Sequence, residues 1–250
     1  MTIVMRQPRE QKWFQMANLE YVVCQNRIIT LLKGHKAHRY LDIGCNAGEF
    51  TRQCANILEA QEIHGIELDP EIAVKAEKNG VRVLVADAGE KYPYPDHYFD
   101  VITANQLLEH VADTDNVLRE CHRLLTEDGL LILGTPNLCS LLQRVLILSG
   151  NQPTTLHVSE VQVGNFIRGT TTGNEHIHAF SPGALEDLIK YHGFRIEKKL
   201  GCGFYPLMPP ASAWAARLFP RLAVFYIISA RKDRSDKLMV VPQDTVNGAH

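Results

Sequence analysis

The sequence predicts an α/β fold: a Rossmann-like, doubly wound and mostly parallel sheet of seven strands with helices on both faces. Three observations predict it. Short apolar runs alternate with helical patterns from residue 39 to residue 135. Two of the runs, VRVLVA and GLLILGT, are almost purely apolar, as is typical of strands buried on both faces of a parallel sheet. The same alternation resumes near residue 181.

Each element follows from its apolar spacing and its end signals. Strands are predicted at residues 39–44, 62–68, 81–86, 99–105, 129–135, 194–200 and 222–231. Helices are predicted at about 10–34, 48–58, 70–79, 114–125 and 181–192. In the last helix, Ser181 is a typical N-cap, the next residue is a proline, and Gly193 supplies a stop.

The chain is expected to have an N-terminal helical segment (1–37), a main domain (38–231) and a flexible tail (232–250). Two insertions interrupt the main domain, at 138–180 and 201–220. The first has two readings: an amphipathic helix over the sheet edge, or a lid that shapes a substrate pocket. The second has three: a pocket wall, a dimer contact, or contact with a membrane surface that carries a lipid substrate.

Composition narrows the class of protein. The formal net charge is -2 and no basic stripe is visible, so no nucleic-acid partner is predicted. The six cysteines are scattered without zinc spacing, which favours a reducing compartment. The N-terminus lacks the apolar core of a signal peptide. Arg217, Pro220 and Arg221 interrupt the longest apolar stretch, so we expect no transmembrane segment and a cytoplasmic protein.

The stretch LDIGCNAGEFT is a strand that ends in a glycine turn and enters a helix. A dinucleotide turn that started at Gly44 would need glycines where Asn46 and Glu49 stand. Glu49 would also place a carboxylate near the phosphates, which disfavours a nicotinamide dinucleotide. The remaining pattern is D-x-G-x-x-x-G, with Asp42, Gly44 and Gly48, and asparagine tolerates the left-handed backbone that such a turn needs.

Two carboxylates follow at the ends of the next strands. Glu67 can accept hydrogen bonds from both hydroxyls of a ribose, and Asp87 can accept from an exocyclic amine such as that of adenine. Ribose and adenine without phosphate indicate S-adenosylmethionine. Structural alternatives stay open: Asp42 as a helix cap, Glu67 as a solvated charge and Asp87 as a turn residue. Cys45 is interpreted as a small side chain of the turn rather than a nucleophile.

The segments LDIGCNAGEFT, GIELDP, ADA, YPDHYFDVITANQLLEHV, LLTEDGLLILGTPN and HAFSPGALEDLIKYHGF together resemble the class I S-adenosylmethionine-dependent methyltransferases. The similarity is greatest to the small-molecule branch that includes the ubiquinone-biosynthesis type, the methyltransferase type 11 group. It covers residues 38–136 well and 176–231 loosely. Asn46 and the TEDG turn depart mildly from the family pattern, and neither departure removes a needed group.

The resemblance implies a sheet with an antiparallel last strand and S-adenosylmethionine as methyl donor. It implies that the donor site is formed by Asp42, Gly44, Cys45, Asn46, Gly48, Glu67, Leu68, Asp87, Ala88, Asn105 and Leu107. The glycine turn would surround the methionine part, Glu67 the ribose and Asp87 the adenine. Asn105 and Leu107 would lie near the transferred methyl.

Transfer of the methyl is an in-line displacement, in which positioning can supply on the order of 7–11 kcal/mol. An oxygen nucleophile must also lose its proton, commonly to histidine. His110, after the fourth strand, is the predicted general base, and His178 is the second candidate. The alternative is that Glu109 and His110 only hold their loop in shape. His176 was considered with His178 as a substrate contact.

No metal is predicted. Four residues could in principle supply metal ligands, but their spacing matches no recognisable metal site: His157, Glu175, His176 and His178.

The sequence therefore predicts an S-adenosylmethionine-dependent methyltransferase that acts on a small molecule. Oxygen is the expected acceptor atom, with nitrogen and carbon as alternatives. Two further alternatives stay open. The acceptor could be an apolar or lipid-linked molecule, and the protein could form a homodimer. The rival hypothesis is a methyltransferase-like scaffold that binds the donor, or nothing, without catalysis.

Overall fold

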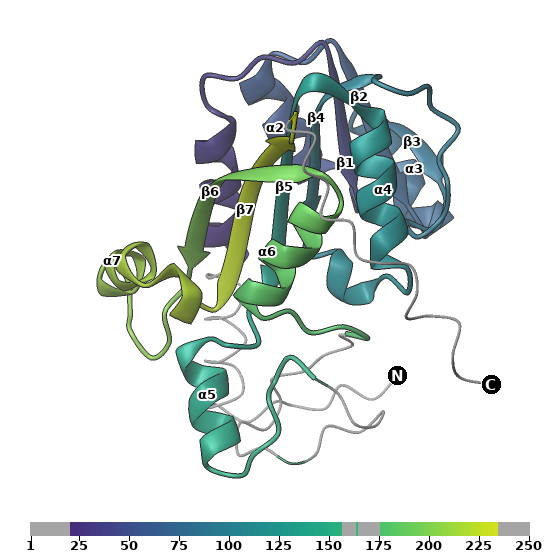
Figure 1. Ribbon diagram of the computed structural model, residues 1–250. Helices are drawn as coiled ribbons and strands as arrows, with labels where there is room; N and C mark the ends of the chain where they lie inside the picture. The colour runs from purple at the N-terminus through teal and green to yellow at the C-terminus, as the bar shows by residue number, and fades with distance from the viewer. Residues whose placement is uncertain (1–20, 157–163, 165–175, 235–250) are drawn as a thin grey trace, which may run out of the picture.

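A computed structural model describes residues 21–156, 164 and 176–234. Its centre is a seven-stranded sheet in the order β3-β2-β1-β4-β5-β7-β6 (Figure 1). The strands are β1 Arg39–Ile43, β2 Glu62–Glu67, β3 Arg82–Val85, β4 Phe99–Asn105, β5 Leu125–Pro136, β6 Phe194–Cys202 and β7 Phe225–Lys232. Strands β1 to β5 pair in parallel, whereas β7 is antiparallel to both β5 and β6. The predicted α/β fold with an antiparallel last strand is confirmed.

The sheet has a helical layer on each face, and each layer encloses its own apolar core. The helices are α2 Glu49–Leu58, α3 Pro70–Lys78, α4 Thr114–Leu124, α5 Leu141–Leu148, α6 Pro182–Tyr191 and α7 Ala211–Leu218, with 3₁₀ turns η1 Leu108–His110 and η2 Pro220–Leu222. One core joins α4 and α6 to the sheet, and the other joins α2, α3 and the helical residues 21–32. Two covered faces explain why the central strands are apolar throughout.

One edge of the sheet gathers the ends of several strands. Strands β1, β2, β4 and β5 all end there, and β7 begins there because Phe225 pairs with Pro136. We call this the carboxyl edge. Ligands of open α/β sheets bind in the crevice at this edge, so the residues just after each strand are the relevant ones.

The helix signals in the sequence work as predicted. Ser181 Oγ accepts from the backbone amide of Ala184 at 3.1 Å, and Pro182 occupies the first helical position of α6. Gly193 follows this helix with φ +79°. Helix α3 begins in the same way at Asp69, whose Oδ1 accepts from the backbone amides of Glu71 and Ile72. Local capping therefore sets these boundaries.

Several element bounds differ from the prediction; the strand predicted at 222–231, for example, begins only at Phe225. Strand β5 begins at Leu125, because Leu125 already pairs with Phe99 before a register shift, so the TEDG residues lie inside the strand. The 201–220 insertion forms helix α7, and the 138–180 insertion contains helix α5. Of the predicted first helix, residues 21–32 are helical, and the part before residue 21 lies outside the described residues. The domain boundaries stay predictions.

Among the described helices, none combines the length and the apolar character that a bilayer-spanning segment requires.

Candidate functional site

The glycine turn between β1 and α2 has the left-handed backbone that the sequence predicted. Gly44, Asn46 and Gly48 have φ of +77°, +47° and +85°. The backbone amides of Gly44 and Cys45 both donate to the carbonyl of Ile66, at 2.8 and 3.0 Å. The turn is therefore tied to β2, and its backbone forms part of the carboxyl edge.

Gly48 is needed for space as well as for its backbone. A Cβ at this position would lie 3.0 Å from the Cα of Ala76 and 3.2 Å from Val81 Cγ2. Gly48→Ala is expected to lower the free energy of unfolding by about 1–3 kcal/mol in urea denaturation. Gly34→Ala is the matched control, because Gly34 has the same φ of +85° and nothing within 4 Å of the added Cβ. Equal losses in the two variants would contradict the steric argument.

Glu67, at the tip of β2, accepts three backbone hydrogen bonds. Its Oε2 accepts from the amide of Asn46 at 2.9 Å, and its Oε1 accepts from the amides of Leu68 and Asp69 at 3.0 and 3.1 Å. The side chain is half-buried. These bonds hold the carboxylate beside the glycine turn, and Oε2, which accepts only one of them, retains acceptor capacity for a ligand hydroxyl.

Asp42 lies beneath the turn as a buried brace. Its two carboxylate oxygens accept from the hydroxyls of Thr51 and Thr103, both at 2.6 Å, and it is 4% exposed. Burial raises the pKa of this carboxyl to about 6. Asp42 does not cap α2, whose N-cap is Gly48. It joins β1, α2 and β4, which shapes the site from below; direct contact with the donor stays a prediction.

The other predicted donor residues occupy the same edge. Leu68 is 67% exposed, and Ala88 is buried with its carbonyl accepting from a tyrosine hydroxyl. Asp87 Oδ1 accepts from the backbone amide of Gly89 at 2.7 Å, so this side chain shapes a turn, and its contact with adenine is untested. Burial raises the pKa of the Cys45 thiol to about 12. A thiol with so high a pKa is a poor nucleophile, which supports its structural interpretation.

The tip of β4 presents buried polar groups without partners. Asn105 Oδ1 accepts from Cys24 Sγ at 3.6 Å, but among the described residues neither Asn105 Nδ2 nor Gln106 Nε2 has a hydrogen-bond partner. Leu107 lies against the turn, since a Cβ on Gly44 would be 2.9 Å from its Cδ1. Gln106 has no separate role in the sequence-based prediction, because only the packing of β4 reveals that its amide is buried.

Glu109 is the residue that sequence reasoning undervalued. It is 1% exposed, and neither of its carboxylate oxygens has a hydrogen-bond partner within the described part of the chain. Burial raises the pKa of this carboxyl to about 8. A buried carboxyl without partners is costly and often marks a functional site. The motif LLEHV was visible in the sequence, but the burial was not.

The predicted bases His110 and His178 gather around Glu109. His110 Nε2 is 4.0 Å from Glu109 Oε1, and the His110 ring packs edge-to-face on His176, with centroids 4.7 Å apart. The backbone amides of Ile177 and His178 donate to the Glu109 carbonyl at 2.9 and 3.1 Å. The segment that starts at His176 therefore completes the cluster that the η1 turn begins.

Three side chains of this cluster offer metal-ligand atoms. Those of Glu109, His110 and His176 lie within 4.8 Å of one another, so together they could hold a cation. The expectation that the site uses no metal stays a prediction. His157 and Glu175, which the sequence also offered as ligands, lie outside the described residues.

The residues at the carboxyl edge fit an adenosyl ligand. The Gly44 turn offers bare backbone, and Glu67 offers a carboxylate at a strand tip. Asn105 offers a buried amide donor that has no hydrogen-bond partner among the residues the structure describes. A ribose and an amino-acid group provide the complementary donors and acceptors. Glu49, at the first position of α2, makes the same edge unsuited to a diphosphate.

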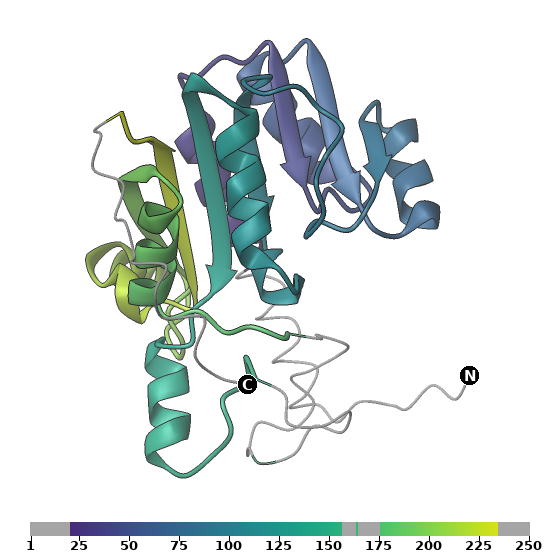
Figure 2. The same cartoon turned by 45° about the vertical axis from the view of Figure 1, so that its right-hand side comes forward.

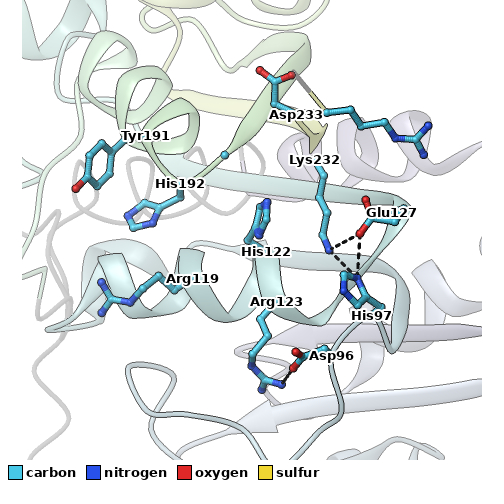
Figure 3. A pocket seen from close by; sticks show the side chains of 12 residues that line it. Asp96, His97, Arg119, His122, Arg123, Glu127, Tyr191, His192, Lys232 and Asp233 are labelled. Atoms are coloured by element: carbon cyan, nitrogen blue, oxygen red, sulfur yellow. Dashed lines mark hydrogen bonds and ion pairs between the residues drawn. The ribbon is translucent and has the colours of Figure 1, made fainter. Parts of the chain in front are cut away.

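A second hollow, of about 790 Å³, lies at the opposite edge of the sheet (Figure 3). Its charged side chains largely neutralise one another. Arg123 is 2.7 Å from Asp96, and Lys232 is 3.5 Å from Glu127 and 3.0 Å from His97 Nδ1. The hollow is thus separate from the glycine turn, and its paired charges do not indicate an anion site.

Comparisons with known proteins indicate the family of the domain. Residues 41–133 match the family model described as a methyltransferase domain. The uncharacterized protein MJ1123 of Methanocaldococcus jannaschii is 31% identical over 123 residues, which cover 49% of this chain and 55% of that protein. The chain thus spans about half of this archaeal relative. The ubiquinone biosynthesis O-methyltransferase of Xanthomonas euvesicatoria is 27% identical over 206 residues, which cover 78% and 76% of the two chains.

A solved structure shares the fold. The S-adenosylmethionine-dependent methyltransferase of Thermotoga maritima, a possible histamine N-methyltransferase, superposes with a TM-score of 0.60 at 20% identity. The superposition covers 89% of this chain and 94% of that one. Three observations indicate the same class of protein: the sheet order, the left-handed glycine turn, and the family match over residues 41–133. The chain therefore contains a class I S-adenosylmethionine-dependent methyltransferase domain, for which S-adenosylmethionine is the methyl donor.

Proposed function

We propose that the chain is an enzyme that transfers the methyl group to an oxygen atom of a small-molecule acceptor. S-adenosylmethionine supplies a methyl group that its sulfonium already activates. Transfer is an in-line displacement: the C–O bond forms as the C–S bond breaks, and the sulfur leaves as the thioether S-adenosylhomocysteine. His110 accepts the proton of the acceptor hydroxyl, because it belongs to the turn that directly follows β4.

The bond between the glycine turn and Glu67 is the observation that carries this proposal. The Asn46 amide donates to Glu67 Oε2 at 2.9 Å, which fixes a carboxylate next to bare backbone at the carboxyl edge. A ribose with two hydroxyls is complementary to this arrangement. The buried amide of Asn105 supports the proposal from the next strand, where the methionine part is expected.

The function is tested with methyl-labelled S-adenosylmethionine. Purified protein is incubated with the donor and a small-molecule extract, and the labelled product is identified by mass spectrometry. A labelled methyl ether, together with one equivalent of S-adenosylhomocysteine, is the expected result. A labelled amine or carbon compound would move the acceptor atom to nitrogen or carbon. Calorimetric binding of the donor without any labelled product would favour the rival scaffold.

Glu67→Ala is expected to weaken donor binding by roughly 1–3 kcal/mol, or about 5- to 150-fold in Kd, because buried ribose hydroxyls lose their acceptor. Isothermal titration calorimetry measures the change. Glu71→Ala, an exposed glutamate at the start of α3, is the control and should bind like the wild type. An unchanged Kd for Glu67→Ala would remove the ribose assignment.

The proposal also includes the cellular location of the enzyme and the chemical class of its acceptor. We infer a cytoplasmic protein from the scattered free cysteines, of which all except Cys139 are buried. The acceptor is proposed to be apolar or lipid-linked, which agrees with the apolar insertions at 138–180 and 201–220. A homodimer stays a prediction.

A further inference from the structure

Helices α5 and α7 expose an unusual amount of apolar surface. On α5, Leu148 is 88% exposed, Ile147 52% and Val145 49%. On and after α7, Trp214 is 66% exposed and Phe219 53%. We call these five side chains together the α5–α7 surface. Large exposed apolar side chains gathered on one short helix, as on the last turns of α5, mark an interaction site.

The orientation of α5 indicates that the exposure of its apolar side chains has a function. Gln143 is its buried polar residue, at 3% exposed, and its amide bonds both Thr154 Oγ1 at 2.7 Å and the Thr154 backbone amide at 2.9 Å. Leu148, at the other end of the helix, points to solvent. A helix made only for water would turn its leucines inward and its glutamine outward. Helix α5 is therefore held with part of its apolar side outward.

Both helices leave the sheet at the carboxyl edge. The Asn137 amide donates to the Val224 carbonyl at 2.8 Å, and Asn137 Nδ2 donates to the carbonyls of Ala223 and Arg221 at 2.8 and 3.0 Å. The segment that enters α5 is thus bonded to the segment that leaves α7. Figures 1 and 2 both show the two helices at the end of the molecule where β5 and β6 end. The α5–α7 surface therefore lies on the same side of the molecule as the carboxyl edge.

The two segments that carry this surface contain charged side chains of one sign only. No aspartate or glutamate occurs in residues 138–159 or 201–232, although the whole chain has a net charge of -2. Arg144 and Arg217 are exposed on α5 and α7. Apolar side chains flanked by arginines are complementary to a bilayer with anionic headgroups, where the apolar groups enter the acyl boundary.

A second copy of the chain is a poorer occupant. A two-fold interface sets the same patch against itself, so Arg144 and Arg217 would face arginines with no acid in either segment. Like charges across an interface are unfavourable. We propose that the α5–α7 surface docks the protein on an anionic lipid bilayer, with the carboxyl edge toward the membrane. Docking in this orientation would let the acceptor enter the site from the lipid, and only this consequence rests on the proposed function.

The test uses the full chain and vesicles of phosphatidylglycerol and phosphatidylcholine. The variant Trp13→Phe leaves Trp214 as the only tryptophan. The proposal expects the unaltered chain to sediment with anionic vesicles, less so with pure phosphatidylcholine or at high salt, and Trp214 emission to shift to the blue. Leu148→Asp should lower the partition coefficient roughly tenfold or more. Val74→Asp, at a site 49% exposed on α3, is the control and should partition normally.

Several results would overturn the proposal. These are no sedimentation of the unaltered chain with anionic vesicles, equal partition of the Leu148→Asp and Val74→Asp variants, and a dimer in analytical ultracentrifugation that Leu148→Asp separates. Donor affinity, measured by calorimetry on the same samples, should be unaffected by Leu148→Asp. Absence of docking by the unaltered chain, with its donor binding intact, therefore refutes the docking alone, whereas absence of donor binding by the unaltered chain refutes the proposed function alone.

Discussion

Replacing His110 with alanine is expected to lower methyl-transfer turnover by roughly 100-fold or more, while affinity for S-adenosylmethionine changes less than about twofold. The reason is position. His110 closes the η1 turn directly after β4, its side chain is 37% exposed, and its Nε2 is 4.0 Å from Glu109. An imidazole at the edge of the site can take a proton from an acceptor hydroxyl without touching the donor.

The measurement is single-turnover methyl transfer with the acceptor from the labelling screen, accompanied by calorimetry of donor binding. His178→Ala is the matched control. Its Nε2 is 3.4 Å from the Ala112 carbonyl, so that ring has an anchoring contact of its own, and a smaller loss is expected. Wild-type turnover in His110→Ala would leave His110 with only the role of holding the loop. A larger loss in His178→Ala would transfer the proposed role to His178.

Glu109→Gln is expected to make the protein more stable at alkaline pH. Burial raises the folded pKa of Glu109 to about 8 from an ordinary value of 4.5. The folded chain therefore holds this proton more tightly than the unfolded chain does. Its stabilising contribution is complete below about pH 4.5 and is lost as the pH rises through 8. The loss amounts to on the order of 4–5 kcal/mol between those limits.

Urea denaturation from pH 5 to pH 9 tests this prediction. The wild-type free energy of unfolding should fall across the range, and Glu109→Gln should remove most of that fall because an amide has no proton to lose. Glu77→Gln, at an exposed position of α3, is the control and should follow the wild-type curve. Parallel curves for wild type and Glu109→Gln would mean that a group outside the described contacts, such as a bound cation, keeps the carboxylate charged.

Most of the fold was predictable from short stretches of sequence. Strand β4 has the predicted bounds, and β1 and β2 each differ by one residue at one end. These predictions succeeded because burial on both faces demands an apolar run and because helix caps are local. The helix Ala211–Leu218 was missed, since the prolines before it and at its end conceal its pattern.

Part of the candidate site was equally predictable from the sequence. The left-handed turn at Gly44 and Asn46 and the carboxylate at the tip of β2 are adjacent in space because neighbouring parallel strands end at one edge. The roles of individual side chains were less visible. Both oxygens of Asp42, whose contact with the donor stays a prediction, accept from threonine hydroxyls, one of them 61 residues away in the chain. No local pattern predicts such a bond.

The sequence by itself determined the sheet, the glycine turn and the two acidic strand ends, because each depends on neighbours within a few residues or on the regular alternation of strand and helix. Only the tertiary structure decided that the Glu109 carboxylate is buried without a hydrogen-bond partner among the described residues and that α5 points Leu148 to solvent. The physical reason is that burial and exposure are set by distant segments packing together, here η1 against the segment from His176 and Asn137 against the residues after α7.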